Sequence, residues 1–416
     1  MKLVPAYLFT IAFLVVFAMQ VPAHTVYADG SSTLNGKPLQ TAEYVTVAKV
    51  AGSSASAHIK PDSSSAKVAT VKGGDEYPVL ATAKYYYQIQ LLAGQKGWVH
   101  RSSVSVRKAP RYVAGWNYLG GTDKFIEASG AAALDVVMPR WYGLNPNSLV
   151  SAAPDKRYVD WAHARGKKVW AMLGNGFDIE LTDRILSSPA NRAEVIRKLA
   201  ESLKANGIDG LNVDFENMKM DNRDEFVLFI RDLKKSLAGT GKTVSVDVTR
   251  ENPDPNWSGS YDRAGLGKAA DYVMMMGYDE YYEGRGEAGS VSSLPWAEEG
   301  LRLLLRDVPA HKVILGVPFY TREWTVPASG GKATAKDVPM KQIDGWLSSR
   351  GLTKKWDAAA KQNYAEFTDA AGRHRLWVED WASMAARWQL VKKYSLAGVS
   401  AWSIGQEPPD IWYVFK

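Results

Sequence analysis

The sequence predicts an α/β protein: a (β/α)8 TIM barrel with a small α+β insertion before its last strand, preceded by a small all-β domain. From residue 108 onward, apolar runs of strand length alternate with amphipathic helical segments, which is the pattern of βα units in a parallel sheet. Eight such runs can be counted, the number that closes this kind of barrel. Between residues 44 and 107, short β-rich runs are separated by turn-forming residues.

The N-terminus predicts an export signal followed by a linker. Lys2 precedes an apolar run over residues 6–19, and residues 26–28 fit a small-residue cleavage site. We therefore expect residues 1–28 to be removed as a signal peptide, residues 29–43 to form a polar linker, and the protein to be secreted. An uncleaved membrane anchor is the alternative, but the run is shorter than the about 18 apolar residues that span a bilayer.

Residues 44–107 are expected to form the all-β domain. Its clearest strand-like runs cover residues 68–71, 76–80, 86–91 and 97–100. The order of these runs and the closing Gly97, Trp98 and Val99 resemble a bacterial SH3-type domain, a family that commonly holds exported enzymes on the cell wall. The eight Lys/Arg against three Asp/Glu favour an anionic wall polymer as its partner, and a solvated basic face is the alternative.

Residues 108–416 are expected to form the barrel. Its strands are predicted at residues 112–116, 134–138, 168–172, 211–216, 244–248, 272–278, 313–320 and 397–404. Ser188 followed by Pro189 predicts the start of the helix before strand four, because these residues suit the cap and the first helical position. Residues 321–396 are too many for one crossover helix, which predicts the inserted subdomain.

Strand four carries the most informative side chains. Side chains alternate across a strand, so Leu211, Val213 and Phe215 are expected to pack against helices, whereas Asn212, Asp214 and Glu216 are expected to face the barrel interior. Burying polar groups costs free energy unless they are hydrogen-bonded and serve a purpose. Glu216 falls at the C-terminal end of the strand, where barrel enzymes place their chemistry.

Residues 209–216 resemble the Asp-x-x-Asp-x-Asp-x-Glu signature of glycoside hydrolase family 18. Further matches follow in order at residues 276–279, 315–322 and 398–403, so the resemblance covers the whole barrel. Residues 139–142, Asn217 and residues 377–380 are similar to the spore and cell-wall subset of that family.

The resemblance implies a mechanism in which the N-acetyl oxygen of the substrate attacks C1 with retention. Glu216 would be the general acid, Asp214 and Tyr278 would bind the acetamido group, and Trp402 would form the floor under the sugar. For a further group, substrate contact and structural roles stay open: Asn212, Asp279, Trp141, Tyr142, Tyr320 and Arg322. Asp209 is expected to support the site or to form a turn rather than to act as a catalyst.

Two departures from the family pattern stand out. The middle Asp of the signature is Asn212, and the Ser-x-Gly-Gly of many chitinases is replaced by residues 172–176. The first change predicts that Asp214 lacks a like-charged neighbour in the interior, so that coupled titration between two acids is lost.

Other classes of function are disfavoured. The net charge of +7 is modest for 416 residues, which argues against nucleic-acid binding. The chain has no Cys for thiol chemistry and six scattered His, so we expect no metal and no cofactor. We also expect a monomer. The leading hypothesis is a cell-wall or spore-wall β-N-acetylglucosaminidase acting on peptidoglycan. A chitinase or chito-oligosaccharide hydrolase is the alternative, and Glu216 argues against a non-catalytic glycan-binding protein.

Overall fold

The computed structural model describes residues 43–118, 120–130 and 133–415, together with the backbone of short strands between residues 24 and 38. These strands are β1 (His24–Val26), β2 (Ser32–Leu34) and β3 (Lys37–Pro38), which pair in that order in an antiparallel sheet. Apart from them, the predicted signal peptide and the predicted linker up to residue 42 lie outside the described residues.

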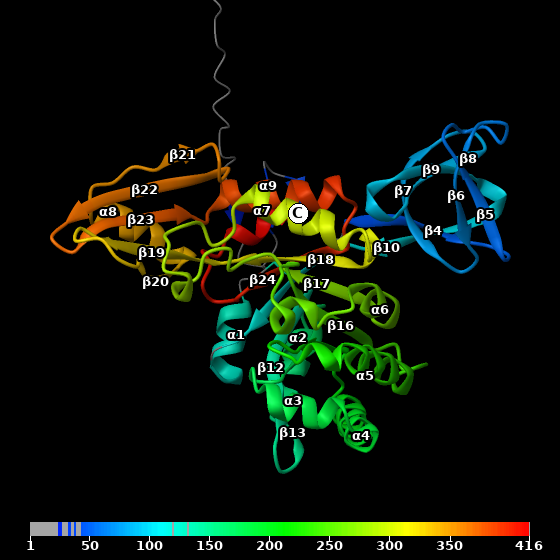
Figure 1. Cartoon of the computed structure of the whole chain (residues 1–416), viewed down its shortest axis with the longest axis horizontal. Coiled ribbons are helices and arrows are strands. Elements are labelled where there is room, and N and C mark those ends of the chain that lie inside the picture. The colour runs from blue at the N-terminus through cyan, green and yellow to red at the C-terminus, as the bar shows by residue number, and fades with distance from the viewer. Residues whose placement is uncertain are drawn as a thin grey trace, which may run out of the picture. The chain divides into compact units, whose positions relative to one another are not determined.

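The small all-β domain consists of seven antiparallel strands, drawn in blue to cyan in Figure 1, and confirms the predicted fold. They are β4 (Tyr44–Val50), β5 (Ser54–His58), β6 (Lys67–Lys72), β7 (Glu76–Thr82), β8 (Tyr86–Gln90), β9 (Lys96–His100) and β10 (Val104–Pro110). Their order in the sheet is β10-β4-β7-β8-β9-β5-β6. Val50, Ile89 and Val99 contribute to a small buried core between them.

Eight parallel strands close into a barrel in the described part of the chain, which confirms the predicted fold class (Figure 1). They are β11 (Tyr112–Asn117), β12 (Val136–Asn145), β14 (Lys168–Gly174), β15 (Gly210–Asp214), β16 (Thr243–Thr249), β17 (Tyr272–Met276), β18 (Val313–Pro318) and β24 (Gly398–Trp402). The ring closes because β11 pairs with both β12 and β24. A further strand, β13 (Leu149–Ala152), extends β12 as a hairpin.

Helices follow most of the strands. They are α1 (Thr122–Gly130), α2 (Lys156–His163), α3 (Ile179–Leu186), α4 (Pro189–Ala205), α5 (Arg223–Ser236), α6 (Arg263–Ala269), α7 (Leu294–Leu304) and α9 (Trp381–Lys393). Ser188 caps α4 as predicted, since its side chain accepts a hydrogen bond from the Asn191 N–H. Among the described residues, no helix combines the length and the apolar character that crossing a membrane requires.

The predicted insertion is an antiparallel sheet with one short helix. It comprises β19 (Tyr320–Pro327), β20 (Thr334–Pro339), α8 (Ile343–Ser348), β21 (Lys355–Asp357), β22 (Gln362–Asp369) and β23 (Gly372–Val378). The strand order is β20-β19-β23-β22-β21, and Figure 1 shows these strands in yellow to orange. Trp346 of α8 packs on Phe367 of β22, with ring centroids 5.8 Å apart.

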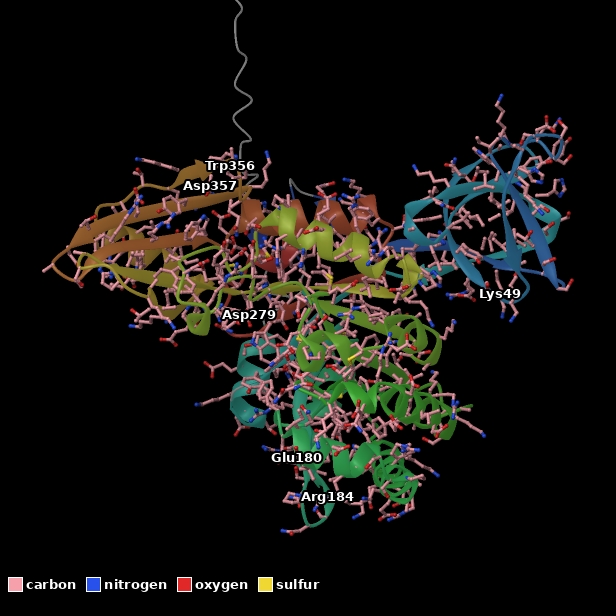
Figure 2. All side chains as sticks on the ribbon, viewed as in Figure 1. Lys49, Glu180, Arg184, Asp279, Trp356 and Asp357 are labelled. Atoms are coloured by element: carbon pink, nitrogen blue, oxygen red, sulfur yellow. The ribbon has the colours of Figure 1, made fainter. Side chains whose placement is uncertain are left out.

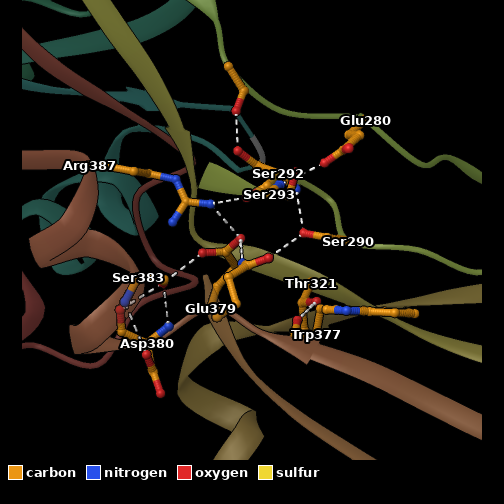
Figure 3. A network of polar contacts seen from close by, with 12 residues as sticks. Glu280, Ser290, Ser292, Ser293, Thr321, Trp377, Glu379, Asp380, Ser383 and Arg387 are labelled. Atoms are coloured by element: carbon orange, nitrogen blue, oxygen red, sulfur yellow. Dashed lines mark hydrogen bonds and ion pairs between the residues drawn. The ribbon is translucent and has the colours of Figure 1, made fainter. Parts of the chain in front are cut away.

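A buried polar network ties the insertion to the barrel (Figure 3). Glu379, which follows β23, and Arg387 of α9 form an ion pair with an N–O distance of 2.8 Å and almost no exposure to solvent. Gln362 donates to the same carboxylate at 2.7 Å and accepts from Ser290, which lies in the loop after β17. Arg387 also donates to the carbonyl oxygen of Ser292 in that loop. The loop that follows β17 is therefore held by groups from the insertion and from α9.

Candidate active site

The structure confirms the predicted alternation along β15. Leu211, Val213 and Phe215 are fully buried in the core between the barrel and its helices. Asn212 is also fully buried, but it lies inside the barrel, where its carbonyl oxygen accepts from the Trp116 indole N–H at 2.8 Å. The sequence alternation thus sends polar side chains into the interior, as side chains on successive strand positions must face opposite ways.

Asp214 ends β15, Glu216 follows it by two residues, and burial raises the pKa of both carboxyl groups. Asp214 is 9% exposed, and burial raises its pKa to about 7. Burial also raises the pKa of Glu216 well above its ordinary value, and the negative charges of Asp214 and Asp279 raise it further. A carboxyl group that keeps its proton near neutral pH can serve as a general acid.

Asp214 also has an oxygen without a partner. Its Oδ1 is buried and makes no hydrogen bond within the described residues. An unpaired buried acceptor costs free energy, so such a group is usually explained by a ligand or water that completes it.

A further interior carboxyl, Asp247 of β16, was not identified from the sequence. It is 2% exposed and its Oδ1 accepts from Asn212 Nδ2 at 2.7 Å. Burial and the charge of Asp214 raise its pKa, while the hydrogen bond from Asn212 lowers it. The expectation that Asp214 has no like-charged interior neighbour is therefore wrong, because Asp247 supplies that charge from the next strand.

Aromatic rings form one wall of the site. Trp402 of β24 stacks on Tyr278, which follows β17, with centroids 6.3 Å apart and planes at 29°. Tyr118, which was not singled out from the sequence, lies on Trp402 at 4.7 Å, and Trp116 lies at 5.7 Å. Burial raises the pKa of Tyr278, and the negative charges of Asp247 and Asp214 add to this effect.

Asp279, labelled in Figure 2, is joined to two residues of the insertion. Its Oδ1 accepts from the Tyr320 hydroxyl at 2.5 Å and from Arg322 Nη1 at 2.8 Å. Its side chain is 47% exposed, and its φ of 64° lies in the left-handed region that non-glycine residues rarely adopt. The three predicted residues thus meet at one place beside Tyr278, where the insertion joins the barrel.

Trp141 and Tyr142 are not part of this group, and of the two roles left open by the sequence their contacts favour the structural one over substrate contact. A register shift between Arg140 and Tyr142 redirects β12. Trp141 is 6% exposed and packs edge-on against Tyr158 of α2. The Tyr142 hydroxyl pairs with Ser202 of α4 at 2.8 Å. Both side chains belong to the packing between the strands and the surrounding helices.

Asp209 is also remote from the site, which corrects the expectation that it supports the catalytic groups. It precedes β15, about 16 Å along the strand from Asp214. There it accepts from the Val169 N–H at 2.8 Å and pairs with His163. Asp135 and Asp271 accept in the same way from the N–H groups of Val113 and Val244, the second residues of β11 and β16. Asp209 therefore completes the hydrogen bonding at the N-terminal end of the barrel.

The described residues contain no group of three or more His, Cys, Asp or Glu side chains arranged to hold a metal ion.

Comparisons with known proteins agree with this geometry. Residues 111–407 match the family described as Glycosyl hydrolases family 18, and residues 53–105 match the family described as Bacterial SH3 domain. An uncharacterized glycosylase, YvbX of Bacillus subtilis, is 28% identical over 284 residues, which cover 64% of this chain and 79% of that protein. The cortical fragment-lytic enzyme of Bacillus subtilis is 25% identical over 58% of this chain. That match spans 56%, only about half, of the lytic enzyme's own length.

Solved structures share the fold. The spore cortex-lytic enzyme SleL of Bacillus megaterium superposes with a TM-score of 0.66 at 20% identity, covering 77% of this chain and 76% of that one. A chitinase from Chromobacterium violaceum superposes with a TM-score of 0.65 at 22% identity, covering 73% of this chain and 97% of that one. The family match extends over most of the chain and includes every barrel strand in full. The chain is a glycosidase, and it belongs to family 18 of the glycosyl hydrolases.

Proposed function

We propose that this protein hydrolyses glycans containing N-acetylglucosamine, with peptidoglycan as its substrate and with the N-acetyl group of the substrate as the nucleophile. The observation that carries the proposal is the pairing of Glu216, whose proton is retained by burial, with Asp214, whose buried Oδ1 lacks a partner among the described residues. An acid and an acceptor for an acetamido N–H thus stand two residues apart on one strand.

The reaction would proceed in two steps. Glu216 donates its proton to the glycosidic oxygen while the acetamido carbonyl oxygen attacks C1, which breaks the bond between C1 and the leaving oxygen. Asp214 accepts the acetamido N–H and stabilises the positive charge of the oxazolinium-like intermediate, and Tyr278 donates to the acetamido oxygen. Water then attacks C1 and returns a proton to Glu216, which gives retention. The face of Trp402 supports the sugar ring.

Peptidoglycan is proposed rather than chitin because of the relatives. Two of them are named for the spore cortex or its fragments, and the small β domain matches a bacterial SH3 family. Because a chitinase has a similar fold, chitin oligosaccharides are the second candidate substrate. Purified peptidoglycan and chitin, digested side by side and analysed for new reducing ends, distinguish the two. Release from chitin alone would contradict the peptidoglycan proposal.

Replacing the general acid tests the mechanism. Glu216→Gln keeps the shape of the side chain but removes the proton, so turnover should fall by roughly 10²- to 10⁴-fold while oligosaccharide binding is retained. Glu201→Gln, at an exposed position of α4 whose carboxylate pairs with Arg197, is the matched control and should behave as wild type. Turnover of Glu216→Gln within about threefold of wild type would contradict the assignment.

We also infer that the protein is exported and that its SH3-type domain binds an anionic polymer of the wall. The domain presents exposed cations next to tyrosines: Lys84 lies 4.9 Å from the Tyr85 ring centroid, and Arg101 lies 4.7 Å from that of Tyr87. Replacing Lys84, Lys96 and Arg101 by Glu should weaken sedimentation with insoluble wall and leave turnover of small soluble substrates unchanged. High salt should reproduce this loss for the wild type. Equal sedimentation of both proteins would refute the charge-based attachment.

A further inference from the structure

The backbone of Glu216 lies beyond the end of the sheet. The ladder between β14 and β15 ends at the pair Gly174 and Asp214, and the ladder between β15 and β16 ends one residue earlier. At Asn217 the chain turns, with a φ of 53°. The N–H and C=O of Glu216 therefore need partners other than a neighbouring strand, because largely buried backbone groups are costly when unpaired.

A single side chain supplies both partners. Asn175, which follows β14, is 4% exposed. Its Oδ1 accepts from the Glu216 N–H at 3.1 Å, and its Nδ2 donates to the Glu216 carbonyl oxygen at 2.7 Å. The side-chain amide of Asn175 thus makes the two hydrogen bonds that a neighbouring strand would otherwise make with Glu216.

The orientation of this amide is fixed by a third contact. Asn175 Nδ2 also donates to the Thr182 hydroxyl at 2.9 Å, and that hydroxyl donates to the Asp178 carbonyl oxygen at 2.6 Å. Thr182 is fully buried at the start of α3. Turning the amide over would place its oxygen against the Glu216 carbonyl oxygen, so only the observed orientation satisfies every group.

The opposite side of the same segment is held as well. The Tyr261 hydroxyl donates to the carbonyl oxygen of Phe215 at 2.8 Å. Asn175 and Tyr261 therefore fix two successive residues of the chain from the loops after β14 and β16. The Glu216 side chain starts from a backbone that has little freedom to move.

We propose that Asn175 is a positioning residue of the reaction, which holds the backbone of Glu216 so that its carboxyl group reaches the leaving oxygen. This inference rests on the proposed function. It also gives a role to residues 172–176, the segment that departs from the chitinase pattern. A displacement of about 1 Å at a reacting group can cost roughly 100-fold in rate, so the loss of this amide should be visible in turnover.

Two substrates with the same sugar portion and different leaving groups separate positioning from general stability. The para-nitrophenyl glycoside of di-N-acetylchitobiose releases a stable phenolate that needs little protonation, whereas tri-N-acetylchitotriose releases a sugar alkoxide that needs the acid. For Asn175→Ala, kcat on the trisaccharide should fall roughly 10- to 100-fold with KM within about twofold, and kcat on the nitrophenyl glycoside should fall much less. Glu216→Gln lacks the acid altogether, so it sets the upper limit for the difference between the losses on the two substrates in the same assay.

Matched variants complete the test. Asn206→Ala removes an amide that donates to the Ser202 carbonyl oxygen at the end of α4, and it should leave both rates unchanged. Thr182→Val removes the hydroxyl that orients Asn175, so kcat on the trisaccharide should fall by a smaller factor than in Asn175→Ala. Thr182→Ser keeps the hydroxyl and should have the wild-type rate. If Asn175→Ala does not fold, these two variants decide the question. Equal losses on both substrates, or no loss, would overturn the inference. A wild-type protein inactive on both substrates and on purified peptidoglycan would instead refute the proposed function.

Discussion

The contact between Asn212 and Asp247 leads to a quantitative prediction for Asn212→Asp. The variant replaces the donor Nδ2 by an oxygen 2.7 Å from Asp247 Oδ1, in an interior where the two residues are 0% and 2% exposed. Two unit charges at that distance repel by about 6 kcal/mol at an effective dielectric constant of about 20. The pair should therefore hold one proton more than the wild-type Asn–Asp pair.

The retained proton determines how stability changes with pH. A carboxyl whose pKa is raised in the folded state stabilises the protein fully below its unfolded pKa and loses that contribution as pH rises through the folded pKa. Relative to wild type, Asn212→Asp should therefore lose about 1.4 kcal/mol of unfolding free energy per pH unit above about pH 4, until the pair releases its proton. The pH–activity profile should change shape as well, since Asp214 acquires a further titrating neighbour besides Asp247 and Glu216.

Urea unfolding followed by tryptophan fluorescence at pH 5, 6, 7 and 8 measures this slope. Asn363→Asp is a matched control, because Asn363 donates to Asp380 at 2.8 Å in the same way. That site is only partly buried and holds Lys354 at 2.9 Å from Asp380, so the extra slope should be much smaller. Parallel stability curves for Asn212→Asp and wild type would refute the reasoning.

Two further predictions concern other buried carboxyls. The unfolding free energy of the wild type should itself fall between about pH 5 and pH 7. Burial raises the pKa of Asp214, Glu379 and Glu407 each to about 7, so the unfolded chain binds fewer protons than the folded protein in that range. Stability that rises over this interval in calorimetry would contradict these shifts. Arg387→Met leaves Glu379 buried without its cation and should cost about 3–5 kcal/mol at pH 8 but less at pH 5, where Glu379 takes up a proton. An equal cost at both pH values would show that loss of the ion pair does not cause the destabilisation. Lys198→Met, on the surface of α4, is the control.

The fold and the centre of the site could be predicted from the sequence because they follow from periodicity. Alternation along residues 211–216 assigned the interior face of β15, and the same rule applied to residues 243–249 would have placed Asp247 beside it. The roles of Trp141 and Tyr142 could not be decided from the sequence, because a register shift in β12 interrupts alternation and nothing in the local residue pattern marks it.

The contacts made by loops were beyond prediction for a different reason. Asn175 reaches Glu216 across 41 positions, and Tyr320 reaches Asp279 across the same number. Such pairings depend on where the loops after separate strands meet, and side-chain hydrogen-bonding capacity alone does not specify the partner. The sequence did indicate that residues 172–176 depart from a known pattern, and this was the available signal for Asn175.

The closure of the barrel bears on how the folded protein avoids self-association. With β11 bonded on both sides, the barrel ring offers no unpaired row of N–H and C=O groups to another chain, and this protection does not depend on side chains. The insertion is different, because its sheet ends in two open edges at β20 and β21. The strand β21 has only three residues, including Lys355, and β20 carries Lys336 and Asp337 and ends in Pro339. Short, charged and proline-terminated edges are poor templates for a further strand, so the insertion limits intermolecular β-pairing by sequence where the barrel limits it by geometry.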